Sequence, residues 1–164
     1  MEDLPDWDLP SPHVHVVEAV NADIDGYGHV NNAVYLRWLD QAAWSHSTAL
    51  GLDPETCLAG GRSMAVWRTQ ANYLAPAFAG DRLQVGTWII GNDGRLRVSR
   101  RFQVRRAADG ACLLRALIHY VCIELSSGRA RRMPASFVTG YAIREDVAHA
   151  CALEPTPFAP GVEP

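Results

Sequence analysis

Four long strand segments separated by tight turns are the feature that most constrains how this chain can fold. After residue 62 the sequence contains runs rich in β-branched and aromatic residues, bounded by Gly-Asn-Asp-Gly at 91–94 and Ala-Asp-Gly at 108–110. Such turns between such runs are typical of antiparallel hairpins. We therefore predict strands over 63–74, 82–90, 95–106 and 111–125, and a shorter first strand over 13–20.

One long helix is expected between the first strand and the other four. Asn31 or Asn32 can cap its start, and Gly51 is placed to end it. The buried stripe follows helical spacing through Tyr35, Trp38, Leu39, Ala42, His46, Ala49 and Leu50. Residues 21–31 and 52–61 are expected to be irregular. One helix and five antiparallel strands predict an α+β domain in which the sheet wraps around the helix.

The two ends of the chain differ in composition from this domain. Residues 1–12 are acidic and proline-rich and are interpreted as a flexible N-terminal arm. We expect residues 13–140 to form the domain. Residues 141–164 are expected to be a C-terminal extension, with a short helix over 143–150 and a proline-rich end.

Composition excludes several classes of function. The net charge of −3 argues against a nucleic-acid partner. Neither an apolar run of membrane-spanning length nor a basic, apolar signal sequence occurs, so we expect a cytoplasmic protein without a membrane partner. The four cysteines form no CxxC pair and no zinc-ligand spacing, which predicts no metal site and no disulfide framework.

The loop before the helix carries the densest chemistry. Two carboxylates, Asp23 and Asp25, are followed by two glycines, Gly26 and Gly28, just ahead of the helix start. The free N–H groups of a helix N-terminus can polarise a carbonyl and hold the oxyanion formed when it is attacked. A neighbouring carboxylate can attack directly or activate water. Loops of this kind also supply helix caps, and capping or local hydrogen bonding is the role we expect for Asp23.

Three segments carry a resemblance to a known family. They are Asp-Ile-Asp-Gly-Tyr-Gly-His-Val-Asn-Asn with the following eight residues at 23–40, Asn-Tyr-Leu-Ala-Pro-Ala-Phe-Ala-Gly-Asp-Arg-Leu at 72–83, and Gly-Arg-Ala-Arg-Arg-Met-Pro at 128–134. Together they resemble the hotdog-fold acyl-CoA thioesterases of the 4-hydroxybenzoyl-CoA thioesterase type. The resemblance covers about residues 13–140, with the motifs in the right order and spacing.

The resemblance implies a five-stranded antiparallel sheet around one long central helix, and a homodimer or homotetramer with its active site at the dimer interface. By resemblance, Asp25 is the catalytic nucleophile or general base, and the backbone N–H of Asn32 polarises the thioester carbonyl. His29 and Asn31 line the same loop, where His29 is a further catalytic candidate and Asn31 is expected to bind substrate. The chemistry implied needs no cofactor.

Binding of the substrate is expected to involve residues outside this loop. Tyr35 is expected in the acyl pocket, with Trp38, Trp67 and Tyr73 as further candidates. All 15 basic side chains other than histidine are arginines, which bind phosphate well. Arg101, Arg129 and Arg131 are therefore predicted to contact the coenzyme A phosphates, with Arg97, Arg100 and Arg132 as weaker candidates. His46 and His119 are interpreted as core or interface histidines.

Other functions fit the same fold. One is a hotdog hydratase or dehydratase acting on acyl chains, and another is a non-catalytic module that binds acyl-CoA or an acyl-carrier protein. The acid and the Gly-His-Val-Asn-Asn segment lie together in the loop before the helix, which favours hydrolysis. The sequence leaves open the acyl chain, and whether coenzyme A or an acyl-carrier protein delivers it.

Overall fold

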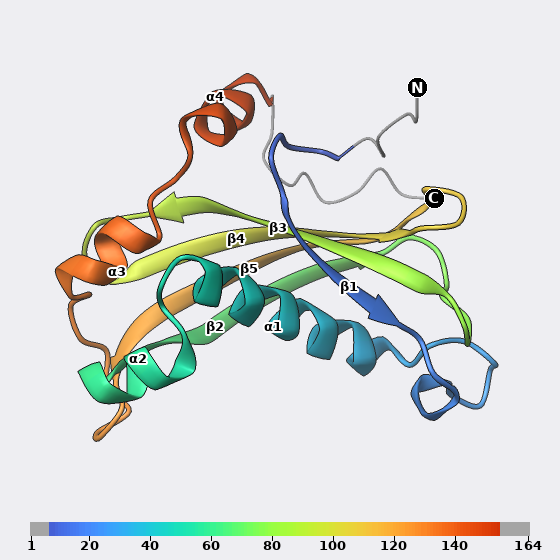
Figure 1. Ribbon diagram of the computed structural model, residues 1–164, viewed down its shortest axis with the longest axis horizontal. Coiled ribbons are helices and arrows are strands. Elements are labelled where there is room, and N and C mark those ends of the chain that lie inside the picture. Colours follow the sequence, from blue (N-terminus) through green and yellow to red (C-terminus); the bar gives the residue numbers. More distant parts are fainter. Residues whose placement is uncertain (1–6, 155–164) are drawn as a thin grey trace.

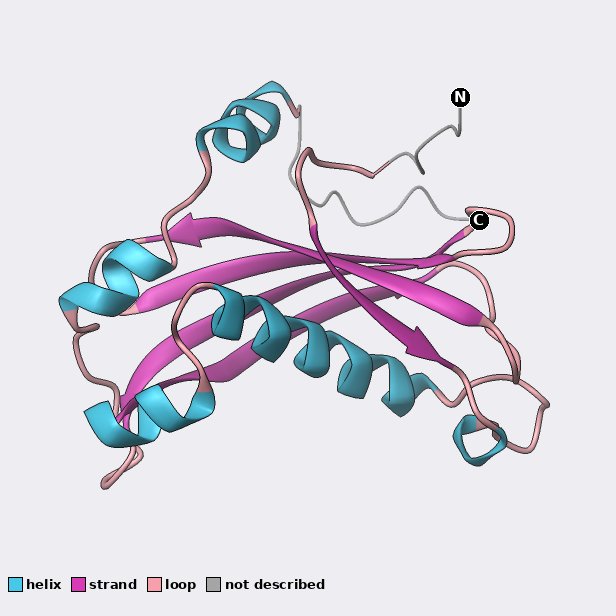
Figure 2. Ribbon diagram, in the orientation of Figure 1, coloured by secondary structure: helices cyan, strands magenta, loops and turns pink. Residues whose placement is uncertain are grey.

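The computed structural model describes residues 7–154 and shows an antiparallel sheet curved around a helix (Figures 1 and 2). The sheet has five strands in the order β1-β3-β4-β5-β2. The strands are β1 (His13–Glu18), β2 (Arg62–Tyr73), β3 (Arg82–Asn92), β4 (Arg97–Arg106) and β5 (Cys112–Glu124). The helices are η1 (Asn21–Asp23), α1 (Asn32–Ala49), α2 (Pro54–Gly60), α3 (Ala135–Gly140) and α4 (Glu145–Leu153). The predicted architecture is confirmed.

The core lies between α1 and the concave face of the sheet. Tyr35, Trp38, Leu39 and Ala42 are buried, as the helical spacing predicted, whereas Ala49 and Leu50 at the end of the predicted stripe are exposed. The buried residues pack in one cluster with inward-facing side chains of β3, β4 and β5, namely Leu83, Val85, Phe102, Val104, Leu114 and Ala116. This burial fixes the position of both ends of α1 against the sheet.

Residues 52–61 are not irregular throughout, because α2 forms there. The Asp53 side chain accepts a hydrogen bond from the Thr56 N–H at 2.7 Å, Pro54 occupies the first turn, and Gly61 ends the helix with φ 66°. Asp-Pro is a recognised helix start, and the sequence carried this signal. The short helix α3 was also not predicted.

The N-terminal arm is not flexible over residues 7–12. Leu9 is 2% exposed and packs with Trp88 of β3 and Val147 of α4. The Trp88 Nε1–H donates to the Pro10 carbonyl at 2.8 Å, and Asp8 pairs with Arg115 at 2.6 Å. The described arm and α4 therefore cover the face of the sheet opposite α1. Residues 1–6 and the proline-rich end at 155–164 lie outside the described residues.

Replacing Leu9 tests whether this arm is part of the folded domain. Leu9→Ala removes a fully packed side chain and is expected to lower the free energy of unfolding by about 2–4 kcal/mol, measured by urea denaturation. Leu58→Ala is the control, because Leu58 is 70% exposed. Equal, small effects of the two substitutions would show that the arm adds nothing to stability.

Candidate active site

The loop between η1 and α1 is a closed turn that presents Asp25. A β-bridge joins Ile24 to Val30, the Asp25 N–H donates to the His29 carbonyl at 2.8 Å, and the Gly28 N–H donates to the Asp25 carbonyl at 3.1 Å. Gly28 has φ 81°, a conformation that side chains with a Cβ rarely adopt. The loop therefore holds Asp25 in a defined place rather than on a loose segment.

The Asp25 carboxylate lines a surface cavity of about 500 Å³. Asp25 is half-buried, and its Oδ1 accepts a hydrogen bond from the Tyr27 N–H at 2.9 Å. That bond fixes one carboxylate oxygen and leaves the other without a hydrogen-bond partner among the described residues. The cavity is completed by Tyr27, His29, Val30, Asn32, Tyr35 and residues 73–76. The structure thus brings together Asp25, His29, Asn32 and Tyr35.

The start of α1 forms one wall of this cavity. Asn31 caps the helix, with its Oδ1 accepting from the Ala33 N–H at 2.9 Å, so Asn31 orders the helix start. No hydrogen bond within residues 7–154 uses the Asn32 N–H. The Tyr73 hydroxyl donates to the Asn32 carbonyl at 3.0 Å and ties β2 to this turn. Asn32, at the positive end of the helix dipole, thus borders the same cavity as Asp25.

Asp23 has a different role from Asp25. It is 4% exposed, its carboxylate accepts from the Val20 N–H at 3.0 Å, and it forms an ion pair with Arg37 of α1. Burial alone would raise the pKa of Asp23, but the Val20 N–H and the Arg37 guanidinium outweigh it and lower that pKa. Asp23 therefore fastens the loop to the helix, as its capping interpretation anticipated.

Aromatic side chains shape the cavity. The Tyr35 hydroxyl accepts from the Ala77 N–H at 3.0 Å, and its ring meets that of Tyr73 at 5.5 Å. Of the other pocket candidates, Trp38 is buried in the core and Trp67 is half exposed near Arg97, so neither lines the cavity. Sequence reasoning did not place the segment 74–76 here, although the Tyr-x-x-Pro motif that contains it was visible.

The arginines predicted to bind phosphate do not meet at Asp25 in one chain. Arg101 is 7% exposed on the face of the sheet opposite α1, where it pairs with Glu154 at 2.6 Å and lies 3.8 Å from Asp8. That assignment is corrected, because the guanidinium is already neutralised by two carboxylates. Arg129 and Arg131 belong to the segment that follows β5, and this segment lies at the α2 end of the molecule, away from the loop between η1 and α1 (Figure 1).

Comparison with known proteins identifies the family and the fold. The Thioesterase-like superfamily matches residues 20–148. The long-chain acyl-CoA thioesterase FadM of Escherichia coli (strain K12) is 29% identical over 111 residues, which are 65% of this chain and 80% of that protein. Two solved structures share the fold. A 1,4-dihydroxy-2-naphthoyl-CoA thioesterase from Synechocystis has a TM-score of 0.71 at 24% identity, covering 80% of this chain and 96% of its own. SAV2348 from Staphylococcus aureus, solved in complex with CoA, has a TM-score of 0.74 at 19% identity, covering 93% and 91%.

The family match, which spans residues 20–148, places the chain in the thioesterase class. The chain belongs to the thioesterase-like superfamily, which confirms the predicted family and the expectation of a thioester hydrolase. Within residues 7–154 no helix has both the length and the apolar character needed to cross a membrane.

The Asp23–Arg37 pair gives a prediction for stability against pH. A carboxylate whose pKa is lowered on folding stabilises the fold above its ordinary pKa of 3.8, and this contribution is lost as the pH falls through the lowered value. Asp23→Asn is therefore expected to cost about 1–3 kcal/mol at pH 7, and the difference should shrink below pH 3.8. Denaturant unfolding of both proteins across pH measures it. A difference independent of pH would contradict a charged role.

Proposed function

We propose that this protein hydrolyses acyl-CoA thioesters, with Asp25 as the catalytic carboxylate and the Asn32 N–H as the donor that polarises the carbonyl. The observation that carries the proposal is their position in one cavity, where a half-buried carboxylate faces the first turn of α1. The similarity to a long-chain acyl-CoA thioesterase and to a fold solved with CoA supports the substrate class.

The chemistry follows from these two groups. The thioester oxygen accepts a hydrogen bond from the Asn32 N–H, and the positive end of the α1 dipole stabilises the negative charge that develops there. The free oxygen of Asp25 either attacks the carbonyl carbon or takes a proton from a water that attacks it. The C–S bond then breaks, and the electron pair leaves with sulfur as a thiolate that takes up a proton. After direct attack, water opens the mixed anhydride to release the acid.

Removing the Asp25 charge tests the proposal. Asp25→Asn keeps size and shape, and is expected to lower kcat/KM for acyl-CoA by at least about 100-fold, measured as thiol release. Glu55→Gln, on the exposed face of α2, is the matched control and should keep full activity.

Two other results of this experiment would change the proposal. Full activity of Asp25→Asn would remove Asp25 from the mechanism, and absence of thiol release from wild type would favour a hydratase or a binding module. A single turnover in ¹⁸O-water adds a test of direct attack, because ¹⁸O enters the Asp25 side chain only when an anhydride forms and water opens it at the Asp25 carboxyl carbon.

We also propose that a second copy of the chain, paired along β2, completes the site. Among the described strands, β2 (12 residues) lies at an edge of the sheet and pairs only with β5. Its middle, from Val66 to Thr69, is exposed, with Val66 51% and Trp67 50% exposed. A long unpaired edge of this kind is a template for pairing with another strand. Pairing two copies of β2 antiparallel about a two-fold axis would cover both edges.

Such pairing supplies the missing arginines. An antiparallel pair places the start of β2 in one copy beside its end in the other. The end of β2 carries Tyr73, which lines the Asp25 cavity. The start of β2 is Arg62, which pairs in register with Glu124, the neighbour of Arg131. Arg129 and Arg131 of the second copy would therefore lie near Asp25 of the first, where they can bind the coenzyme A phosphates.

Mixing two impaired variants, assayed well below the KM, tests this shared site. Asp25→Asn and the double variant Arg129→Gln/Arg131→Gln should each be impaired as pure proteins, the second through a raised KM. Subunit exchange between them creates dimers with one intact and one doubly defective site, so about a quarter of wild-type activity should return. No recovery after exchange, shown by a tagged pull-down, would place the arginines and Asp25 in the same chain or in unrelated roles.

A further inference from the structure

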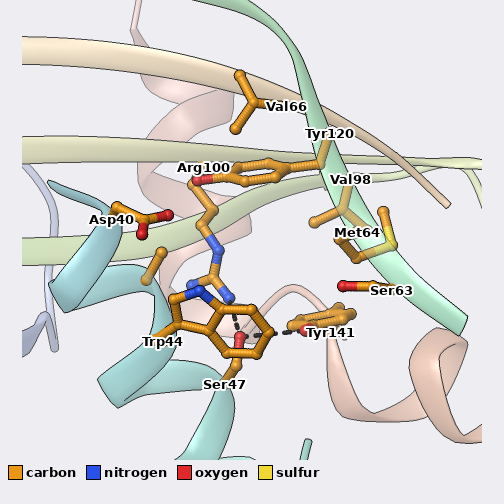
Figure 3. Close-up of a pocket in the computed structure, with 11 residues that line it drawn as sticks. Asp40, Trp44, Ser47, Ser63, Met64, Val66, Val98, Arg100, Tyr120 and Tyr141 are labelled. Atoms are coloured by element: carbon orange, nitrogen blue, oxygen red, sulfur yellow. Dashed lines mark hydrogen bonds between the residues drawn. The ribbon is translucent and has the colours of Figure 1, made fainter. Parts of the chain in front are cut away.

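A second cavity lies farther along α1, between the helix and the sheet (Figure 3). It is bordered by Asp40, Trp44 and Ser47 of α1, and Arg100 of β4 reaches into it. Residues of β2, β5 and the segment after α3 complete it: Ser63, Met64, Val66, Tyr120 and Tyr141. Its volume of about 50 Å³ is several times the roughly 10–15 Å³ that one water needs. The cavity can therefore hold a small polar group.

Arg100 is buried there with neutral partners. Its side chain is 3% exposed, and its two terminal nitrogens donate to His46 Nδ1 and to the Ser47 hydroxyl, each at 2.8 Å. The rings of Tyr141 and Tyr120 lie 5.4 and 6.0 Å from its Cζ. Burial and the neighbouring Arg100 charge lower the pKa of His46 to about 3, so His46 is neutral and accepts.

No carboxylate of the described residues forms an ion pair with Arg100. Arg101, the next residue of the same strand, is also buried, but it forms ion pairs with Glu154 and Asp8. Burying a cation without a counter-charge is costly. Asp40 borders the same cavity but remains on its exposed rim and does not reach the guanidinium. The cavity thus combines a buried positive charge with space beside it.

The position of the cavity relates it to the thioester site. Both cavities lie between α1 and β2: the first at Asn32 and Tyr73, the second at Ser47 and Ser63. With a rise of about 1.5 Å per residue, Asp40 and Ser47 are about 12 and 22 Å beyond Asn32 along the helix. An extended acyl chain attached at the thioester site would need a long hydrocarbon segment to reach Arg100.

From this arrangement we infer that Arg100 binds a carboxylate at the far end of the acyl group, so that the preferred substrates are long-chain thioesters with an ω-carboxylate. This inference rests on the proposed thioesterase function. The carboxylate replaces the missing counter-charge and accepts from the guanidinium, with the Tyr120, Tyr141 and Ser63 hydroxyls as further polar neighbours. The intervening methylene chain follows the seam between the helix and β2.

Matched substrates that differ only at their far end test the inference. The experiment compares kcat/KM for hexadecanedioyl-CoA, carrying a free ω-carboxylate, with that for hexadecanoyl-CoA. Wild type should prefer the first by at least about tenfold, the range of a hydrogen bond to a charged group. Arg100→Gln should abolish this preference by lowering kcat/KM for the ω-carboxy substrate alone, and Arg100→Lys should keep part of it. Arg82→Gln, an exposed arginine at the start of β3, is the control.

A second variant keeps the test valid if Arg100→Gln fails to fold. Ser63→Asp introduces a carboxylate into the cavity from β2, where it can pair with Arg100 and exclude the substrate carboxylate. It should also remove the preference while hexadecanoyl-CoA is still hydrolysed. Equal kcat/KM for the two substrates in wild type, or equal losses on both in Arg100→Gln, would overturn the inference and leave Arg100 as a structural residue.

Binding measurements test this inference independently of the proposed hydrolysis. If neither thioester is hydrolysed, the proposed function fails, but calorimetry with hexadecanoate and its neutral methyl ester still tests whether the cavity binds a carboxylate. Tighter binding of hexadecanoate by wild type, lost in Arg100→Gln, would support the carboxylate site. Equal binding of the acid and the ester would contradict it.

Discussion

The packing of α1 into the concave face of the sheet is the interaction on which the rest of this structure depends. Tyr35, Trp38, Leu39 and Ala42 are buried against β3, β4 and β5, and this fixes the helix in position and direction. The start of the helix is thereby held at the loop of Asp25, and its last turn at Arg100. Both cavities are consequences of how one helix meets one curved sheet.

The direction of α1 also distributes charge between these cavities. The positive end of its dipole lies at Asn32, beside the Asp25 carboxylate, where it can stabilise an anion formed from a carbonyl. The negative end lies in the turn that contains His46 and Ser47, where the Arg100 guanidinium donates to both side chains. A helix C-terminus stabilises a cation. The same dipole therefore lowers the cost of burying Arg100 without a carboxylate partner.

The sequence predicted the strands, the long helix and the loop of Asp25, because these depend on local patterns and turn residues. It also held a signal for Arg100 that was not used: Val98, Arg100, Phe102 and Val104 share one face of a strand by the period of two. The partners of Arg101 could not be predicted in this way. They come from Asp8 and Glu154, which are distant in sequence and meet only after the arm and α4 cover the sheet.

The open edge of β2 connects the chemistry to assembly. Tyr73 at one end of this strand lines the Asp25 cavity, and Ser63 at the other end lines the Arg100 cavity. A second copy paired along β2 would therefore border both cavities at once. Because the pairing is antiparallel, each copy would approach the thioester site of its partner with the end that carries its own Arg100 cavity. Assembly would thus supply a wall for the acyl chain as well as arginines for the coenzyme, and a single chain would lack both.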